Sequence, residues 1–250
     1  GWNSGASPIL WNDKLIVNAS VESQRVVGLD KKTGDELWSV GEIDSSWATP
    51  LIVTNPEGKD ELVVSLKNFA FGIDPANGEK LWTCESVQDY VCPSVIAKDG
   101  IAYITGGRSP YFMAVRTGGH GDVTETHRLW NVKATSKVST PILIGDYLYF
   151  LDHQGTAYCL DAKTGEEIYK ERNDLSGRGD KVYSSYVEMD GKLYIFSRED
   201  GCLVIDPKPE YKILAKNSLD DSSIFNATPV LDNGQLIIRS DENIYCIGLK

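Results

Sequence analysis

Short apolar runs and polar turns alternate along the chain in a fixed order. Runs such as Tyr147–Leu151 and Lys192–Phe196 are rich in aromatic and β-branched residues, which is typical of β-strands. Gly, Asn and Asp separate the runs and indicate tight turns. No stretch has a convincing helical period. The pattern therefore predicts an all-β protein built from many short strands.

One segment shows that the strands form a repeat. Gly28–Trp38 returns as Gly72–Trp82 and again as Cys159–Tyr169, with an Asp, a Gly and an aromatic residue at fixed offsets. The residue at the Asp position can be followed through six units with steps of 44, 42, 45, 45 and 42 residues, at Asp30, Asp74, Arg116, Asp161, Asp206 and Gly248. Units of about 40–45 residues with four strands each are typical of β-propeller blades.

Each unit opens with small residues and, in all units but the fifth, a proline. These openings place the predicted blades at residues 5–40, 45–87, 91–132, 137–174, 182–219 and 225–250. The sixth unit stops after its third strand, so residues 1–4 are expected to close it. We predict one propeller domain over residues 1–250, with about six blades that form a compact ring or part of an eight-bladed one.

The segment between the third and fourth strands of a unit is predicted to be a tight turn. Its Asp accepts backbone N–H groups, and its Gly supplies a positive φ. The tryptophans Trp38, Trp82 and Trp130 then fall on the outermost strand, where a large ring covers the gap between neighbouring sheets.

This pattern resembles the pyrroloquinoline quinone (PQQ)-type propeller repeat. The repeat occurs in quinoprotein dehydrogenases and in the propeller lipoprotein of the outer-membrane β-barrel assembly machinery. The stretch from Arg108 to Thr124 is similar to a group of bacterial PQQ-like repeat proteins. The resemblance implies a location in the periplasm or cell envelope.

The charge balance excludes one class of partner. The chain has 36 acidic and 25 basic residues, a net charge of −11. Nucleic-acid binding needs a basic surface, so no nucleic-acid partner is expected. No apolar run approaches the length of a membrane-spanning helix, so no membrane insertion is expected.

The five cysteines suggest packing more than chemistry. Cys84 and Cys92 flank a short loop and are candidates for a disulfide in an oxidising compartment. Cys159, Cys202 and Cys246 fall on third strands and are interpreted as small buried hydrophobic residues.

Candidate binding residues lie in two sets of loops. In a propeller, the fourth-to-first and second-to-third connections emerge on one face around the channel, where ligands usually bind. These loops supply the candidates for a partner-binding site, or for a small polar ligand in the funnel, namely Asp44, Trp47, Asp89, Tyr90, Arg108, His153, Arg198, Asn226 and Arg239.

The arginines have two interpretations. Second strands of three units are followed by an arginine, namely Arg108, Arg198 and Arg239. These side chains either gather at the channel mouth as hydrogen-bond donors to an anion or carboxylate, or pair with nearby acidic residues. Aromatic residues beside polar ones, as in Asp89-Tyr90, fit a sugar- or peptide-binding rim.

The third unit departs most from the repeat. Thr117 to Arg128 replace a short turn with a Gly-rich loop that holds His120, Asp122 and His127. The spacing matches no metal motif, so the loop is interpreted as a packing element and no metal site is predicted.

Enzyme hypotheses find little support. Quinoprotein dehydrogenases share an adjacent cysteine pair and a calcium shell, and this chain has neither adjacent cysteines nor calcium-ligand spacing. PQQ and calcium are therefore not expected, and no catalytic residue is assigned. The leading hypothesis is a non-enzymatic scaffold that binds a protein or peptide. The alternatives are a divergent quinoprotein-type dehydrogenase, a hydrolase using His153, and a carbohydrate- or anion-binding module using Trp47, Tyr90, Arg108 and Arg198.

Overall fold

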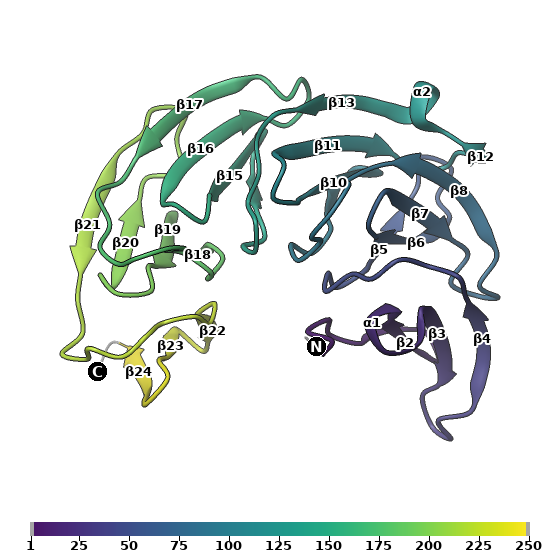
Figure 1. The fold of residues 1–250 in the computed structure, drawn as a ribbon, viewed down its shortest axis with the longest axis horizontal. Coiled ribbons are helices and arrows are strands. Elements are labelled where there is room, and N and C mark those ends of the chain that lie inside the picture. Colours follow the sequence, from purple (N-terminus) through teal and green to yellow (C-terminus); the bar gives the residue numbers. More distant parts are fainter. Residues whose placement is uncertain (1–2, 249–250) are drawn as a thin grey trace. The chain divides into compact units, whose positions relative to one another are not determined.

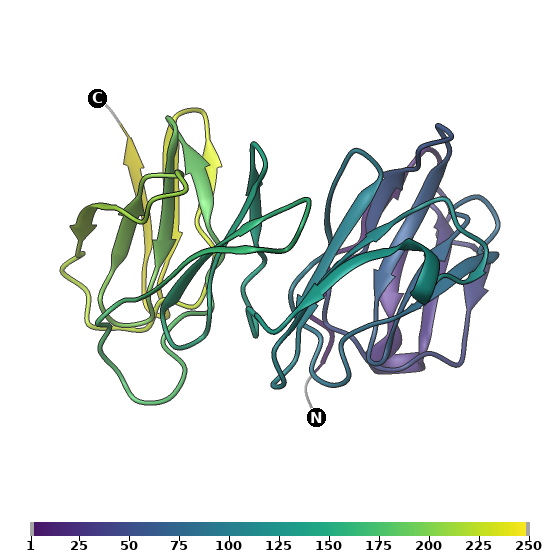
Figure 2. The ribbon, with the colours of Figure 1, turned by 90° about the horizontal axis from the view of Figure 1, so that it is seen from above.

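The computed structural model describes residues 3–248. The chain separates into two compact units, Gly1–Lys137 (unit 1) and Val138–Lys250 (unit 2). Both are built almost entirely of antiparallel sheets, and Figure 1 shows their strands in chain order. In Figure 2 the strands of each sheet run side by side with the usual twist. The all-β prediction is confirmed.

Unit 1 contains three sheets. The first has β1 (Ile9–Trp11), β2 (Lys14–Ala19), β3 (Arg25–Asp30) and β4 (Glu36–Val40), with the short helix α1 (Ser20–Ser23) between β2 and β3. The second has β5 (Leu51–Thr54), β6 (Asp60–Ser65), β7 (Phe69–Ile73), β8 (Lys80–Glu85) and, beyond β8, the added strand β12 (Gly121–Asp122). The third has β9 (Ile96–Lys98), β10 (Ile101–Gly106), β11 (Tyr111–Arg116) and β13 (Arg128–Val132), with α2 (Thr124–His127) before β13.

Unit 2 contains the other three sheets. The fourth has β14 (Ile142–Ile144), β15 (Tyr147–Leu151), β16 (Thr156–Asp161) and β17 (Glu167–Arg172). The fifth has β18 (Val187–Met189), β19 (Lys192–Phe196), β20 (Cys202–Ile205) and β21 (Ile213–Asn217). The sixth has β22 (Val230–Asp232), β23 (Gln235–Arg239) and β24 (Ile244–Gly248). Six propeller blades are therefore confirmed, while the single domain over residues 1–250 stays a prediction.

The sequence repeat is also a repeat of strand register. Gly28 lies opposite Trp38 and Gly72 opposite Trp82, and a β-bulge follows each glycine on the third strand. The bulge recurs after the equivalent residue of the third, fourth and fifth sheets. A bulge adds one residue to one strand and bends it, so the outermost strands of these five sheets turn in the same way.

The turns after β3 and β16 form as predicted. Asp30 Oδ1 accepts the backbone N–H of Lys32 (2.8 Å) and Thr33 (2.9 Å), and Gly34 has a φ of +80°. The bonds from Thr33 and Lys32 hold the pKa of Asp30 below its usual range. Asp161 makes the same two bonds in the fourth sheet.

The tryptophans cover the sheets, as expected. Trp38 packs on Gly28 of its own sheet and on Gly78 of the next, and its Nε1 donates to the Pro75 carbonyl at 3.1 Å. Trp82 is 1% exposed and lies against Gly72, where any Cβ would overlap its indole. The apolar core therefore lies between neighbouring sheets of each unit.

The long loop of the third unit is ordered by the second sheet. Its residues Gly121 and Asp122 form β12, which pairs in parallel with Trp82 and Thr83 of β8. The following residues form α2, which leads directly into β13.

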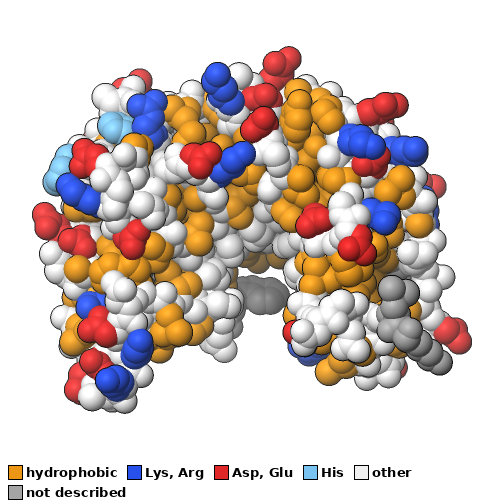
Figure 3. Space-filling model, turned by 180° about the vertical axis from the view of Figure 1, so that it is seen from behind, with side chains coloured by type: hydrophobic (Ala, Val, Ile, Leu, Met, Phe, Trp, Pro, Cys, Tyr) orange, Lys and Arg blue, Asp and Glu red, His pale blue; other side chains and the backbone are white. Residues whose placement is uncertain are grey.

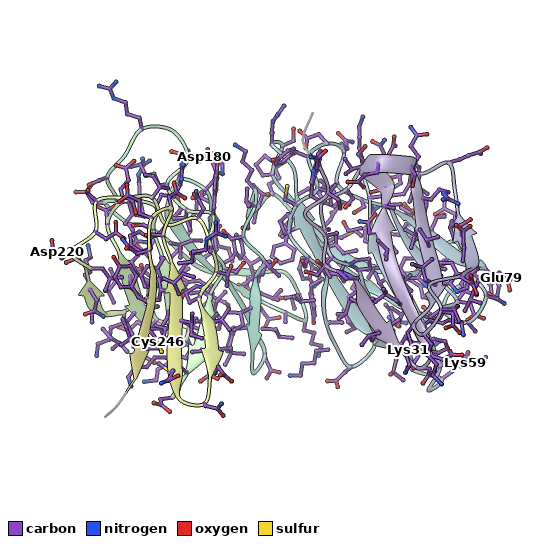
Figure 4. The ribbon with its side chains drawn as sticks, turned by 90° about the horizontal axis from the view of Figure 1, so that it is seen from below. Lys31, Lys59, Glu79, Asp180, Asp220 and Cys246 are labelled. Atoms are coloured by element: carbon purple, nitrogen blue, oxygen red, sulfur yellow. The ribbon has the colours of Figure 1, made fainter. Side chains whose placement is uncertain are left out.

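Three sequence-based expectations concern the cysteines and the chain ends. Cys246 (labelled in Figure 4) is exposed, contrary to its interpretation as a buried residue, because β24 is the last strand of its sheet within residues 3–248 and no outer strand of that range covers it. All five cysteines are free thiols, Cys84 and Cys92 included. The predicted closure by residues 1–4 falls partly on residues 1–2, which lie outside the described residues.

Candidate functional site

Unit 1 brings five of the nine predicted site residues together. They line one pocket of about 300 Å³ with Ser45 and Lys67, and they are Asp44, Trp47, Asp89, Tyr90 and Arg108. These residues come from the fourth-to-first and second-to-third connections, which converge in unit 1 as the propeller order predicts. We call this cavity the aromatic pocket. In Figure 4, α1, another second-to-third connection, lies at the end of unit 1 away from Lys31 and Lys59.

Two aromatic rings and a guanidinium group form the centre of the aromatic pocket. The ring centroids of Trp47 and Tyr90 lie 5.2 Å apart at 37°, and the Arg108 guanidinium lies 5.5 Å from the Tyr90 centroid. Trp47 is fixed by bonds from its backbone N–H to Val91 (2.8 Å) and from Nε1 to the Asn3 carbonyl (3.0 Å). The stack is therefore held before any ligand arrives, which lowers the entropy cost of binding.

Each of the two carboxylates of the aromatic pocket accepts a hydrogen bond through one of its oxygens. Asp89 Oδ1 accepts the backbone N–H of Arg108 at 2.9 Å, and Asp44 Oδ2 accepts Nδ2 of Asn68 at 3.1 Å. Lys67 lies on the same rim and is exposed. The pocket therefore presents both signs of charge beside an aromatic surface.

The other four predicted residues lie in unit 2. Arg198 donates from Nε to Asn226 Oδ1 (2.9 Å) and from a terminal nitrogen to the Asp180 carbonyl (3.0 Å), and its guanidinium lies 4.8 Å from the Tyr183 ring centroid. His153 Nε2 lies 3.9 Å from Oδ1 of Asp180, which is labelled in Figure 4.

Arg239 belongs to a separate small cavity. It lines a pocket of about 290 Å³ with Asn226, Ala227, Ser240 and Asp241.

Arg108 and Arg198 both lie over tyrosine rings, whereas the sequence analysis considered only anions and acidic residues as their partners. A Tyr in each of the two fourth-to-first loops, Tyr90 and Tyr183, was the available signal for this stacking.

Sequence reasoning missed the role of Asp221. Its Oδ2 accepts the hydroxyls of Ser240 and Tyr245, both at 2.7 Å, and its Oδ1 accepts the backbone N–H of Ser223 at 2.8 Å. Hydrogen bonds from Ser223, Tyr245 and Ser240 hold the pKa of Asp221 well below its usual range. This carboxylate ties the sixth sheet to the loop before it.

The described residues also bear on metal and membrane sites. Residues 3–248 hold no cluster of three or more His, Cys, Asp or Glu side chains that suits a metal ion. Within the same range, neither helix has the length and apolar character needed to cross a bilayer. Figure 3 shows acidic and basic side chains mixed on the face that it draws.

Comparison with known proteins decides the family. The family model described as "Outer membrane protein assembly factor BamB" matches residues 2–171. The chain belongs to this family. Among solved structures, the crystal structure of BamB from Moraxella catarrhalis is similar to it, with a TM-score of 0.75 and 14% sequence identity. The match covers 97% of this chain and 71% of that chain. No curated protein sequence matches the chain.

The family assignment confirms the resemblance to the PQQ-type propeller repeat. At 14% identity the structural likeness to BamB establishes the propeller fold and nothing about individual site residues. The role of the aromatic pocket therefore rests on its own geometry.

Proposed function

We propose that this BamB-family propeller is a non-enzymatic scaffold that binds a protein or peptide partner in the cell envelope. The contact is made at the aromatic pocket of unit 1. The observation that carries the proposal is the Trp47–Tyr90–Arg108 stack. It lies in loops whose sequence the repeat does not determine.

The chemistry of the aromatic pocket suits a peptide. Trp, Tyr and Arg are the residue types that dominate binding energy at protein interfaces. A volume of about 300 Å³ is small for a cofactor and accommodates one or two side chains. Asp44, Asp89 and Lys67 offer charge partners on either side of the rings, which favours a segment that carries both apolar and charged groups.

The fold supports the cellular setting only through the family. The matching family model is described by a role in outer-membrane protein assembly, and we infer an envelope location for this chain from that description. The alternative of a quinoprotein-type dehydrogenase receives no specific support from the aromatic pocket, whose lining offers no calcium-type cluster of acids and amides.

The test uses immobilised full chain and envelope extract. Proteins retained by the wild type are identified by mass spectrometry, purified and measured in binary titrations. Trp47→Ala is expected to weaken binding of the authentic partner by about tenfold or more, as for a central aromatic contact. Leu37→Ala is the matched control, because Leu37 is 48% exposed on β4 and lies outside the aromatic pocket.

The outcome separates a site from general adhesion. If the purified partner binds wild type, Trp47→Ala and Leu37→Ala equally, the aromatic pocket is not the contact surface. Circular dichroism of the Trp47→Ala protein shows whether a loss of binding comes from the site or from unfolding.

A further inference from the structure

A second pocket of unit 1 lies where the third unit breaks the repeat. It has a volume of about 520 Å³ between the outer strands of the second and third sheets. Its lining is polar apart from two aromatic residues, and consists of Asn68, Phe69, Glu85, Ser86, Gln88, Tyr111, Arg128 and Asn131. We propose that this cavity, the amide pocket, binds a neutral saccharide that stacks on the ring of Phe69.

Phe69 supplies the apolar surface. It is the first residue of β7 and 43% exposed, so part of its ring is available to a ligand. Its ring stacks on Phe71 with centroids 6.4 Å apart at 22°, so one face is supported from within the sheet. The C–H face of a pyranose ring packs on an aromatic ring in the same way as another flat apolar surface does.

Three amide side chains supply the polar contacts. Asn68, Gln88 and Asn131 each carry a donor and an acceptor, and sugar hydroxyls need both. Asn68 uses Nδ2 on Asp44, which fixes the orientation of its amide and directs Oδ1 as an acceptor. Asn131 Nδ2 lies 3.5 Å from the Tyr111 hydroxyl, a contact long enough to exchange for a ligand.

The buried side chain of Ser86 also points to a ligand. It is 4% exposed, and its hydroxyl has no hydrogen-bond partner among the described residues. A buried hydroxyl without a partner is unfavourable, because it has lost its hydrogen bonds to water. Because Ser86 lines the amide pocket, a ligand hydroxyl that reaches it recovers this cost.

The inserted loop holds the acidic side of the amide pocket. Glu85 donates its backbone N–H to Thr124 Oγ1 at 3.0 Å, and its Oε2 lies 4.0 Å from Arg128. Arg128 also lies 3.6 Å from Glu125 and donates to the Tyr111 hydroxyl at 3.3 Å. Because two carboxylates surround this arginine, an acidic sugar is repelled. A neutral sugar can donate a hydroxyl hydrogen bond to the Glu85 carboxylate.

The loop also makes this pocket particular to one pair of blades. Thr124 and Arg128 belong to the segment that replaces a short turn, and the turns after β3, β7 and β16 have no such insertion. The inference is independent of the proposed function, because the residues that carry it do not line the aromatic pocket.

Isothermal titration with cellotriose and chitotriose tests the proposal. Both probes are neutral and have flat β-linked faces, and glucuronic acid serves as the acidic comparison. We expect at least one neutral probe to bind the full chain with a Kd below about 1 mM. Phe69→Ala and Asn131→Ala should each weaken it by about tenfold. Trp47→Ala, which alters only the aromatic pocket, should change it by less than about twofold.

Three results would overturn the saccharide site. These are no heat from either neutral probe up to about 10 mM, binding that Phe69→Ala leaves unchanged, and tighter binding of glucuronic acid than of both neutral probes. A protein partner that is lost on Phe69→Ala while both sugars fail to bind would assign the amide pocket to peptide recognition instead. Trp47→Ala tests the partner site in the aromatic pocket, and Phe69→Ala tests the saccharide site in the amide pocket. The failure of one proposal is therefore distinguishable from the failure of the other.

Discussion

Glu61 gives the sharpest test of how the second blade is held together. It lies on β6 and is 2% exposed, and three donors converge on its carboxylate. Oε1 accepts Asn55 Nδ2 at 2.7 Å, while Oε2 accepts Trp82 Nε1 at 2.7 Å and the backbone N–H of Gly118 at 3.2 Å. One carboxylate thus joins β6, the covering tryptophan and the inserted loop.

Glu61→Gln keeps the shape and replaces one acceptor by a donor. If the new NH₂ takes the Oε1 position it faces Asn55 Nδ2, which cannot turn away because Asn55 Oδ1 accepts the N–H groups of Glu57 and Lys59. The other orientation faces two donors and is worse. Losing one hydrogen bond to a charged acceptor costs about 1.5–3 kcal/mol. We therefore expect a loss of about 2–3 kcal/mol and a fall in Tm of about 5–10 °C.

Tryptophan fluorescence during thermal and urea unfolding measures the effect. All six tryptophans fall within residues 1–137, so the signal reports unit 1. Glu57→Gln is the matched control, because Glu57 is exposed in the same turn and its ion pair with Lys59 is a surface pair. If both variants melt within about 1 °C of the wild type, the three-donor account of Glu61 is wrong.

Two further predictions concern titrating groups in unit 2. Burial raises the pKa of Cys159 to about 11 and of Cys202 to about 12, so at pH 8 a thiol reagent should label exposed Cys246 first, and mass spectrometry that finds Cys159 labelled as fast would contradict this. Hydrogen bonds depress the folded pKa of Asp221, so its contribution to stability is complete above the unfolded value of about 4 and is lost as pH falls below it. Asp221→Asn should therefore lower the melting temperature of unit 2 at pH 7 and approach the wild type near pH 2, and a difference that stays constant with pH in circular dichroism melts would refute the assignment.

The blades could be predicted because their determinants are local. An Asp that accepts the next backbone N–H groups, a Gly with positive φ and a Trp opposite a Gly are all fixed by short offsets. The β-bulge after Gly28 and Gly72 could not be predicted, because it appears only when the register of two paired strands is known.

The residues of the aromatic pocket could be predicted for a similar reason. Strand order alone places the fourth-to-first and second-to-third connections at one end of each sheet, and Trp47, Tyr90 and Arg108 all lie in those connections. The amide pocket was missed because Phe69 and Asn131 look like ordinary strand residues in the sequence. Their meeting depends on the path of the inserted loop, whose strand and helix leave no periodic signal.

Burial of Cys246 was predicted wrongly for a related reason. Its position in the repeat is the same as that of Gly28 and Gly72, which a tryptophan on the next strand covers. Burial of this position comes from that neighbouring strand and not from the residue itself, and in the described residues β24 ends its sheet.

The small strand β12 also changes what the second blade can do in a crowded cell. Outermost strands such as β4, β17 and β21 end their sheets in the described part of the chain, and each leaves a row of backbone groups able to template a foreign strand. On β8 that row is partly occupied, since Gly121 and Asp122 pair with Trp82 and Thr83, and Val123 donates its N–H to the Thr83 carbonyl at 2.8 Å. A foreign strand must displace the loop before it can add to this blade. The same insertion that shapes a pocket thus protects one sheet from edge-to-edge aggregation.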